Sequence, residues 1–487
     1  FKQAARNGTK LIIIDPRGQS LDAYAWRSVR FSPGGDVSLF NAMLNVIISE
    51  GLFDKNYIDT HTEGFEALAA SIEGMTPEVM SPVCGVDPDT IREVARAYAQ
   101  AENAIIFWGM GISQHVHGTD NARCLISLAL TCGHTGRPGT GLHPLRGQNN
   151  VQGASDAGLI PMVLPDYQPV GDAQLRAAFE ELWNTELDPK PGLTVVEIMD
   201  AIKAGTIKGM YILGENPAMS DPDLTHARAA LAALEHLVVQ DLFVTETAQF
   251  ADVILPAAAW SEKSGTVTNT NRQVQMGRAA LAPPGEAKAD WWIIQEIGLA
   301  WNYNGPEQVF AEMKQGMHSL DHISWSRLER EGSVTYPCQA DDAPGDDVVF
   351  ADAFPRSRGK AKFSPASPLP PDEPVDEAYP TVLTTGRLLE HWHTGAMTRR
   401  SRVLDEREPE AAAFLAPSEL ERLGVASGED IHIATRRGSI TLTARADQTM
   451  PEGMVFVPFA FVEAAANLLT NPALDPFGKI PEFKYAA

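Results

Sequence analysis

Apolar strands and amphipathic helices alternate along the N-terminal part of the chain, and this alternation constrains the fold more than any other feature of the sequence. An apolar strand is expected at 10–14, ending in Asp15, and Asp36 lies in the first turn of an amphipathic helix predicted at 36–49. Three further elements are predicted, which are a helix at 88–101 capped by Asp87, a buried strand at 104–108 and a helix at 119–132. Strands that alternate with helices predict a doubly wound parallel sheet.

The same alternation resumes after a glycine-rich turn and predicts a second α/β unit. The expected elements are helices at 173–185, 195–204, 223–235 and about 290–302, and strands at 210–213, 237–240 and 253–255. The fold class is therefore α/β, with two doubly wound, Rossmann-like domains in succession.

The pattern changes again after a proline-rich segment at 366–380, which is expected to be a stiff linker. Short β segments follow at 381–385, 430–435, 439–444 and 454–459, with one helix at 417–423 and a hairpin turn at 436–438. A β-rich third domain is the consequence. The predicted boundaries are 1–148 and 149–365 for the two α/β domains, 366–380 for the linker and 381–487 for the β-barrel domain.

Composition excludes several classes of protein. The chain has 487 residues, of which 44% are hydrophobic and 21% charged, and its net charge of −24 argues against nucleic-acid binding. No apolar run reaches the roughly 18 residues that a membrane-spanning helix needs, so no direct membrane insertion is expected. The four cysteines lack a CxxC pair, so local motifs supply no iron–sulfur cluster or structural zinc, and no metal ligand is predicted.

The segment 144–158 combines Arg146 with a run of glycine, asparagine and glutamine residues. Glycine lets a backbone approach a ligand closely, and carboxamides offer both donors and acceptors. The planar guanidinium matches a carboxylate with two parallel hydrogen bonds. An ordinary turn needs only one or two such residues, so this stretch indicates a close-fitting polar pocket with Arg146 as an anion clamp.

Acids, carboxamides and glycines also follow the predicted strands, where open α/β sheets bind ligands. In the first α/β unit they are Asp15, Gly35, Asp36, Gly109, Gly111 and Gln114, and in the second Gly214, Glu215, Asn216, Gln240 and Asp241. Any one acid could equally be a helix N-cap. Their recurrence at several strand ends indicates dinucleotide binding.

Short motifs along essentially the whole chain carry a family resemblance. They are Arg146-Gly147-Gln148-Asn149-Asn150, Asp15-Pro16-Arg17, Pro33-Gly34-Gly35-Asp36, Trp108-Gly109-Met110-Gly111, Leu213-Gly214-Glu215-Asn216-Pro217, Val239-Gln240-Asp241 and Thr385-Gly386-Arg387. In their order along the chain they resemble the molybdenum- or tungsten-dependent formate dehydrogenases of the dimethyl sulfoxide reductase family, which bind two molybdopterin guanine dinucleotides.

The resemblance implies an oxidoreductase that converts formate to CO2, with Arg146 as the catalytic clamp and a double-psi barrel closing over the pterins. One dinucleotide would be held by Asp15, Arg17, Gly35, Asp36, Gly109, Gly111, Gln114 and Gln148. The other would be held by Gly214, Glu215, Asn216, Ser220, Gln240, Asp241, Asp290, Arg387, His391, Asn467, Phe483 and Lys484. Gly35 departs from the family, which has a hydroxyl residue there.

The resemblance also implies cofactors and partners beyond this chain. The family's iron–sulfur clusters and metal-ligating cysteine or selenocysteine lie before the matched region. Electrons would pass through iron–sulfur and flavin subunits, with FMN and NAD on the partners, in a cytoplasmic complex.

Four alternatives stay open on the sequence. The pairs His115/His117 and His391/His393 could serve a zinc or non-haem iron hydrolase. An ordinary nicotinamide dehydrogenase would need a GxGxxG fingerprint, and Gly109-Met110-Gly111 stops short of one. Another family member such as a nitrate reductase, or a non-catalytic scaffold subunit of the same fold, is also possible.

Overall fold

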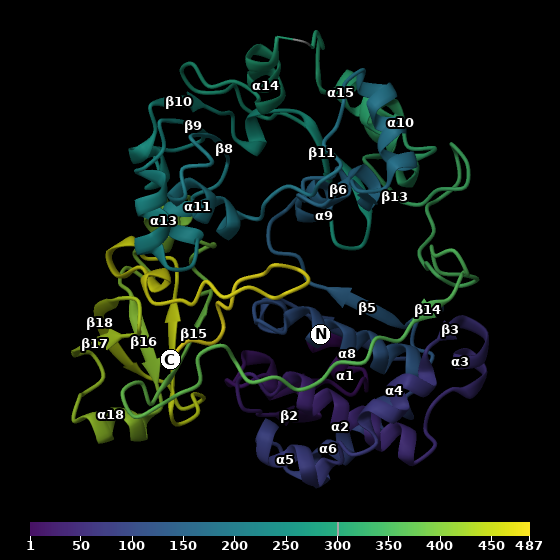
Figure 1. The fold of residues 1–487 in the computed structure, drawn as a ribbon, viewed down its shortest axis with the longest axis vertical. Coiled ribbons are helices and arrows are strands. Elements are labelled where there is room, and N and C mark those ends of the chain that lie inside the picture. Colours follow the sequence, from purple (N-terminus) through teal and green to yellow (C-terminus); the bar gives the residue numbers. More distant parts are fainter. Residues whose placement is uncertain (300) are drawn as a thin grey trace. The chain divides into compact units, whose positions relative to one another are not determined.

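The computed structural model describes residues 1–299 and 301–487, which fold as a mixed α/β protein with two compact units (Figure 1). Unit 1 comprises Phe1–His143, Met219–Thr225 and Phe350–Ala487, and unit 2 comprises Pro144–Ala218 and His226–Val349. Within the described ranges, no helix is long and apolar enough to cross a membrane. Unit 1 thus combines the first predicted α/β region with the C-terminal β-rich region.

The N-terminal part of unit 1 is built around one buried helix, α2 (Asp36–Ser49), whose predicted bounds are confirmed. Every residue from Asp36 to Ile47 is buried, so α2 lies inside the core and not on its surface. The helices that contact it are α4 (Phe65–Ile72), α5 (Pro77–Cys84), α6 (Pro88–Ala99) and α8 (Gly118–Thr131). The other helices here are α1 (Lys2–Arg6), α3 (Lys55–His61) and α7 (Met110–Ser113).

Helix α6 begins as the sequence predicts. The Asp87 carboxylate accepts hydrogen bonds from the backbone N–H groups of Asp89 at 3.0 Å and Thr90 at 3.1 Å. These bonds satisfy two of the donors that a helix start leaves without an internal partner.

The strands of this region are short and form pairs in the described part of the chain, not one continuous doubly wound sheet. The pairs are β1 (Ile12–Ile14) with β2 (Arg27–Val29), β3 (Thr62–Glu63) with β14 (Ala361–Lys362), and β4 (Ile105–Trp108) with β5 (Gly141–Pro144). The β1–β2 and β3–β14 pairs are parallel, as the alternation of strands with helices predicts.

Unit 2 contains the second predicted parallel sheet. Its strands are β8 (Gly209–Leu213), β9 (His236–Asp241) and β10 (Val253–Pro256), in the order β10-β9-β8. Ile212 lies opposite Val239, and Leu255 lies opposite Gln240. Because all strands run the same way, their carboxyl ends, at Leu213, Asp241 and Pro256, meet at one edge of the sheet.

The rest of unit 2 contains predicted and unpredicted helices and a sheet that the sequence did not reveal. The predicted helices are α10 (Ala173–Trp183), α11 (Val195–Lys203) and α14 (Asp290–Gly298), and the unpredicted ones are α9 (Val151–Asp156), α15 (Pro306–Met313) and α16 (Trp325–Glu331). Helices α12 (Pro217–Ser220) and α13 (Leu224–Leu231) also include residues of unit 1. The helix expected at 290–302 therefore ends at Gly298, and residue 300 lies outside the described residues. The unpredicted strands are the antiparallel β11 (Gly265–Thr268), β12 (Gln273–Gly277) and β13 (Ser333–Thr335), and the short pair β6 (Val163–Leu164) and β7 (Gln168–Pro169).

The C-terminal part of unit 1 is a five-stranded mixed sheet in the order β15-β19-β16-β18-β17. Its elements are β15 (Val382–Gly386), α17 (Arg402–Asp405), β16 (Ala412–Leu415), α18 (Pro417–Leu423), β17 (Asp430–Ala434), β18 (Ser439–Ala446) and β19 (Met454–Pro458). The predicted hairpin is confirmed, because β17 and β18 pair antiparallel with Ala434 opposite Ser439. The central strand β16 was not predicted.

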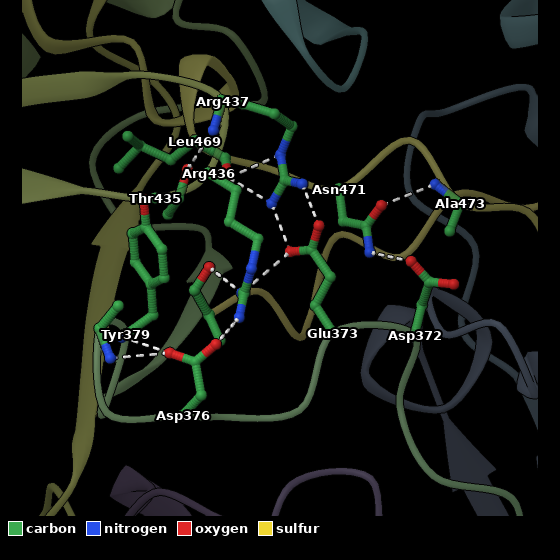
Figure 2. Close-up of polar contacts among 12 residues, drawn as sticks. Asp372, Glu373, Asp376, Tyr379, Thr435, Arg436, Arg437, Leu469, Asn471 and Ala473 are labelled. Atoms are coloured by element: carbon green, nitrogen blue, oxygen red, sulfur yellow. Dashed lines mark hydrogen bonds and ion pairs between the residues drawn. The ribbon is translucent and has the colours of Figure 1, made fainter.

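The segment predicted as a linker is fixed to this sheet by ion pairs (Figure 2). Glu373 forms a two-pronged ion pair with the Arg437 guanidinium, in which the Nη2–Oε2 distance is 2.7 Å. Arg436 donates to Asp376 at 2.6 Å, and its guanidinium lies 4.6 Å from the centre of the Tyr379 ring. Arginines of the β17–β18 turn therefore hold the proline-rich segment in place.

Replacing Arg437 with alanine is expected to lower the thermal unfolding temperature of the protein by a few degrees. The change leaves Glu373, whose side chain is only 15% exposed, with Arg436 at 3.8 Å as its remaining cation, at a cost of about 2 kcal/mol. Arg402→Ala is the matched control, because the Arg402–Glu406 pair is exposed and contributes little. Equal effects of the two substitutions, measured by calorimetry, would contradict this role for Arg437.

Candidate cofactor-binding and active site

Asp15 and Arg17 lie directly after strand β1. The Asp15 carboxylate accepts a hydrogen bond from the Arg17 backbone N–H at 2.9 Å, and burial raises the pKa of Asp15. The Arg17 guanidinium lies over the Phe456 ring of β19, 3.7 Å from its centre. Strand β1 and the C-terminal sheet of unit 1 therefore bring their predicted site residues together.

Three cationic side chains converge at this place, namely Arg17, Arg387 and Lys484. The Lys484 ammonium donates to the Thr385 backbone carbonyl at 2.6 Å. Burial, followed by the positive charges of Arg387 and Arg17, lowers the pKa of Lys484 to about 8, and Asp15 opposes this shift. Such a cluster repels itself until an anion is bound, so it fits the phosphates of a dinucleotide.

Arg387 is the least satisfied of these cations. Its guanidinium lies 5.2 Å from the centre of the Trp392 ring, and burial lowers its pKa. Among the described residues, no hydrogen bond or ion pair engages its nitrogens. The sequence did not single out Trp392, and only the fold shows that it supports Arg387.

Asp36, at the start of α2, is buried with both carboxylate oxygens lacking a hydrogen-bond partner among the described residues. Burial raises its pKa to about 6, although nearby His115 lowers it. Two buried acceptors without donors fit a group that presents paired N–H donors, as the edge of guanine does. The neighbouring Gly35 packs closely against α5, where a Cβ on residue 35 would lie only 2.8 Å from the Cys84 Cα. Its lack of a side chain serves packing.

Asp36→Asn is expected to stabilise the cofactor-free protein at pH 8 and to leave it unchanged at pH 4. Between about pH 4 and 6 the unfolded carboxyl ionises while the folded one keeps its proton, so the free energy of unfolding falls as pH rises. The difference between the two pKa values corresponds to roughly 3 kcal/mol, which the variant recovers above pH 6. Thermal unfolding at both pH values checks this, and an equal gain at pH 4 would refute it.

Glycines after β4 leave open space of the kind that a ligand needs. A Cβ built on Gly109 or Gly111 would meet nothing within 4 Å. Gln114 follows at the end of α7, and its backbone carbonyl accepts the Lys484 N–H at 3.3 Å. The loop after β4 is therefore joined to the cationic cluster, as the predicted site requires.

In unit 2, the residues after β8 form a hydrogen-bonded turn. Gly214 has a φ of +62°, which favours glycine, and a Cβ there would meet nothing within 4 Å. The Asn216 amide donates to Glu246 at 2.8 Å and accepts from the Thr247 hydroxyl at 2.7 Å. Asn216 is buried, so it shapes the turn that presents Gly214 and Glu215, which are exposed.

Gln240, at the end of β9, is fully buried, and its amide bridges two neighbours. It accepts from the Tyr211 hydroxyl and donates to the Asp290 carboxylate at 2.6 Å. Asp290 also pairs with Lys263. Asp241 follows at the strand end and accepts from the Leu242 N–H at 2.6 Å. Gln240 therefore positions Asp290, and sequence reasoning missed Tyr211 and Lys263, which lie far from it along the chain.

Several predicted C-terminal site residues are placed to support the backbone. The buried Asn467 amide donates to the carbonyls of Met219 and Ser220, both at 3.0 Å. The buried His391 ring bonds the Glu408 carbonyl through Nε2 at 2.7 Å. The Phe483 carbonyl accepts from the Thr385 hydroxyl at 2.8 Å. These contacts hold the backbone of the segments that they join.

Arg146 lies in unit 2, between β5 and α9, and its side chain is exposed. Its Nε donates to the Gln152 Oε1 at 3.2 Å. In the described part of the chain, the two terminal nitrogens have no protein partner, so the fork that a carboxylate needs is available. Gln148, also exposed, belongs to unit 2, whereas the other residues predicted for its dinucleotide belong to unit 1.

The two His-x-His pairs do not assemble a metal centre. His115 and His117 stack in parallel with ring centres 5.2 Å apart, and burial lowers the pKa of His117 to about 4. No group of three or more potential ligands is placed to hold a metal ion within residues 1–299 and 301–487. All four cysteines are buried and unpaired.

Comparisons with known proteins show the family of the chain. Residues 1–299 match the family model "Molybdopterin oxidoreductase", and residues 381–487 match "Molydopterin dinucleotide binding domain". The F420-dependent formate dehydrogenase subunit alpha of Methanocaldococcus jannaschii is 45% identical over 100% of this chain and 72% of its own length. Formate dehydrogenase H of Escherichia coli is 35% identical over 99% of this chain and 69% of its own length.

Two further similarities define the breadth of the family. The assimilatory nitrate reductase catalytic subunit of Bacillus subtilis is 34% identical over 100% of this chain and 71% of its own length. The structure of acetylene hydratase from Pelobacter acetylenicus superposes with a TM-score of 0.79 at 20% identity, covering 100% of this chain and 74% of that one. This last likeness shows a shared fold. The chain therefore belongs to the molybdopterin oxidoreductase family.

Proposed function

We propose that this protein oxidises formate to CO2 at a bis-molybdopterin guanine dinucleotide centre that holds molybdenum or tungsten. The observation that carries the proposal is the exposed Arg146 guanidinium, oriented through Nε and open at both terminal nitrogens. Formate is a small carboxylate, which such a fork binds with two parallel hydrogen bonds. The 45% identity to a formate dehydrogenase alpha subunit supports the same substrate.

Arg146 would orient formate as well as bind it. When both oxygens face the guanidinium, the C–H bond of the planar anion points directly away from the arginine. An arginine stays protonated at neutral pH, so Arg146 acts as a clamp and another group takes the proton. Oxidation converts the anion into neutral CO2, which loses both charge-assisted hydrogen bonds, so the same clamp favours product release.

The cofactor would be held by the residues that strand ends and the C-terminal sheet provide. Arg17, Arg387 and Lys484 supply positive charge for phosphates, Asp36 offers acceptors to a guanine, and Gly109, Gly111 and Gly214 leave room for close approach. Once bound, the group supplies the two-electron chemistry. We include two further predictions in this proposal. The sheet of residues 381–487 closes as a double-psi barrel, and all the residues predicted to hold the two dinucleotides contact them.

The electron acceptor on partner subunits is better proposed as F420 than as NAD. Three relatives that are 40–45% identical to this chain are named F420-dependent formate dehydrogenases, and none of these names mentions the NAD linkage that the resemblance implied. Iron–sulfur and flavin cofactors would then connect the centre to a partner that reduces F420, in a cytoplasmic complex.

The test uses the parent holoenzyme purified anaerobically from its native source. Formate-dependent reduction of a viologen dye is expected, with nitrate-dependent oxidation of the reduced dye as the control. Nitrate reduction is the second candidate because a relative at 34% identity is a nitrate reductase subunit. Turnover of nitrate alone, or of neither anion by a metal-loaded preparation, would overturn the formate proposal. Reduction of F420 but not NAD would identify the acceptor.

A further inference from the structure

A polar network in unit 2 lies behind Arg146. The Gln152 Oε1 accepts from the Arg146 Nε at 3.2 Å, and its Nε2 donates to the Asp156 Oδ1 at 2.7 Å. The other carboxylate oxygen of Asp156 accepts from the Tyr336 hydroxyl at 2.7 Å. Gln152 also lies within 3.3 Å of the Tyr336 hydroxyl and 3.4 Å of the Tyr167 hydroxyl.

The network is built on fixed elements. Gln152 and Asp156 are four residues apart on α9, so their side chains share one face of that helix. Tyr336 follows β13, and its backbone N–H donates to the Arg272 carbonyl at 3.0 Å. Its own carbonyl accepts from the guanidinium of Arg272, the residue directly before β12. Asp156 is 5% exposed, so its charge must be satisfied by protein donors.

Two consecutive residues beside the same network have strained backbones. Asp166 and Tyr167 have φ values of +59° and +58°, in the left-handed region that non-glycine residues avoid. The Asp166 carboxylate holds this turn by accepting from the Ser319 N–H at 2.9 Å and from its hydroxyl. Strain of this kind persists where the surroundings enforce it, and it is concentrated at functional sites.

We propose that Gln152, Asp156 and Tyr336 are positioning residues that fix the Arg146 guanidinium, an inference that rests on the proposed role of Arg146. An ionised carboxylate can only accept, so Asp156 requires the NH2 side of the Gln152 amide. The carbonyl side must then face Arg146, whose Nε can only donate. Asp156 thus sets the direction of the amide, and the amide sets the rotation of the guanidinium.

The test is a double-mutant cycle in the holoenzyme, with kcat/KM for formate as the readout. Gln152→Leu is expected to lower kcat/KM by about tenfold or more, the worth of one hydrogen bond to a charged group. In an Arg146→Lys background, which lacks Nε, the same substitution should have almost no further effect. Additive losses would show that Gln152 supports only folding and would overturn the proposal, as would full activity of Gln152→Leu.

A gentler variant guards against misfolding. Tyr336→Phe removes one hydroxyl and is expected to lower kcat/KM several-fold, with unchanged metal and guanine nucleotide per polypeptide. Tyr303→Phe is the matched control, because Tyr303 also donates to a carboxylate in unit 2, that of Glu312, outside the network. Equal activity of the two variants would contradict a positioning role for Tyr336.

A substrate-independent readout separates this inference from the proposed function. Butanedione modifies arginine at its terminal nitrogens, and Arg146 should react several-fold faster in Gln152→Leu than in the wild type, with Arg278 as the internal reference. Absence of formate turnover by the wild type would overturn the proposed function alone. Equal modification rates of Arg146 in the two proteins would overturn the positioning network.

Discussion

Arg146→Lys is expected to lower kcat/KM for formate by about 100-fold, the largest effect that the structure predicts for a single substitution. Lysine keeps the positive charge but offers a point donor in place of a planar fork, so it cannot hold both formate oxygens at once. It also loses the Nε–Gln152 hydrogen bond that fixes the rotation of the side chain. The two charge-assisted hydrogen bonds that are lost, one to a formate oxygen and one to Gln152, account for a decrease of this order.

The measurement is the initial rate of dye reduction against formate concentration in holoenzyme with matched metal content. Arg278→Lys is the control, because Arg278 is an arginine of unit 2 whose guanidinium bonds the Glu329 carbonyl at the surface. It should leave kcat/KM unchanged. An unaltered kcat/KM in Arg146→Lys would remove Arg146 from the mechanism.

Arg387→Gln is expected to weaken retention of the guanine dinucleotide by about 10- to 100-fold. Arg387 is partly buried with no anionic partner among the described residues, so its charge is available for a phosphate. Removing it also relieves repulsion on Lys484, whose pKa should rise above about 8 in the cofactor-free protein. The substitution therefore costs cofactor binding without costing folding.

Guanine nucleotide released on denaturation, with metal per polypeptide, measures this loss. Arg402→Gln is the matched control, since Arg402 is exposed and paired with Glu406 in the same unit. Full cofactor content in Arg387→Gln would contradict a role for this guanidinium in binding the phosphates.

Local features of the fold could be predicted from the sequence because neighbouring residues decide them. Helix α2 spans the predicted 36–49, Asp87 caps α6, and β17 and β18 pair across the predicted turn. Side-chain periodicity and capping act within a few residues, so they are readable without a fold. Strand β16 was missed because Ala412 and Ala413 give it little of the β-branched character that marks a strand.

Residue types at the candidate site were also readable, since glycines, acids and Arg146 stand in recognisable motifs at strand ends. What each side chain does was decided by distant partners. Gln240 and Asn467, which the resemblance predicts to contact the cofactor, also bond protein groups far along the chain: Gln240 bridges Tyr211 to Asp290, and Asn467 holds the backbone at Met219 and Ser220. A buried carboxamide must satisfy its donors and acceptor wherever the fold places partners.

The sequence by itself determined where several helices begin, among them α2 and α6, which predicted strands end in polar residues and that an arginine lies in a glycine- and carboxamide-rich turn. Only the tertiary structure brought Arg17, Arg387 and Lys484 to one place, and only it set Tyr336 against Asp156, 180 residues earlier. The physical reason is range. Capping and periodicity act between near neighbours in the chain, whereas charge repulsion, burial and hydrogen bonding depend on separation in space.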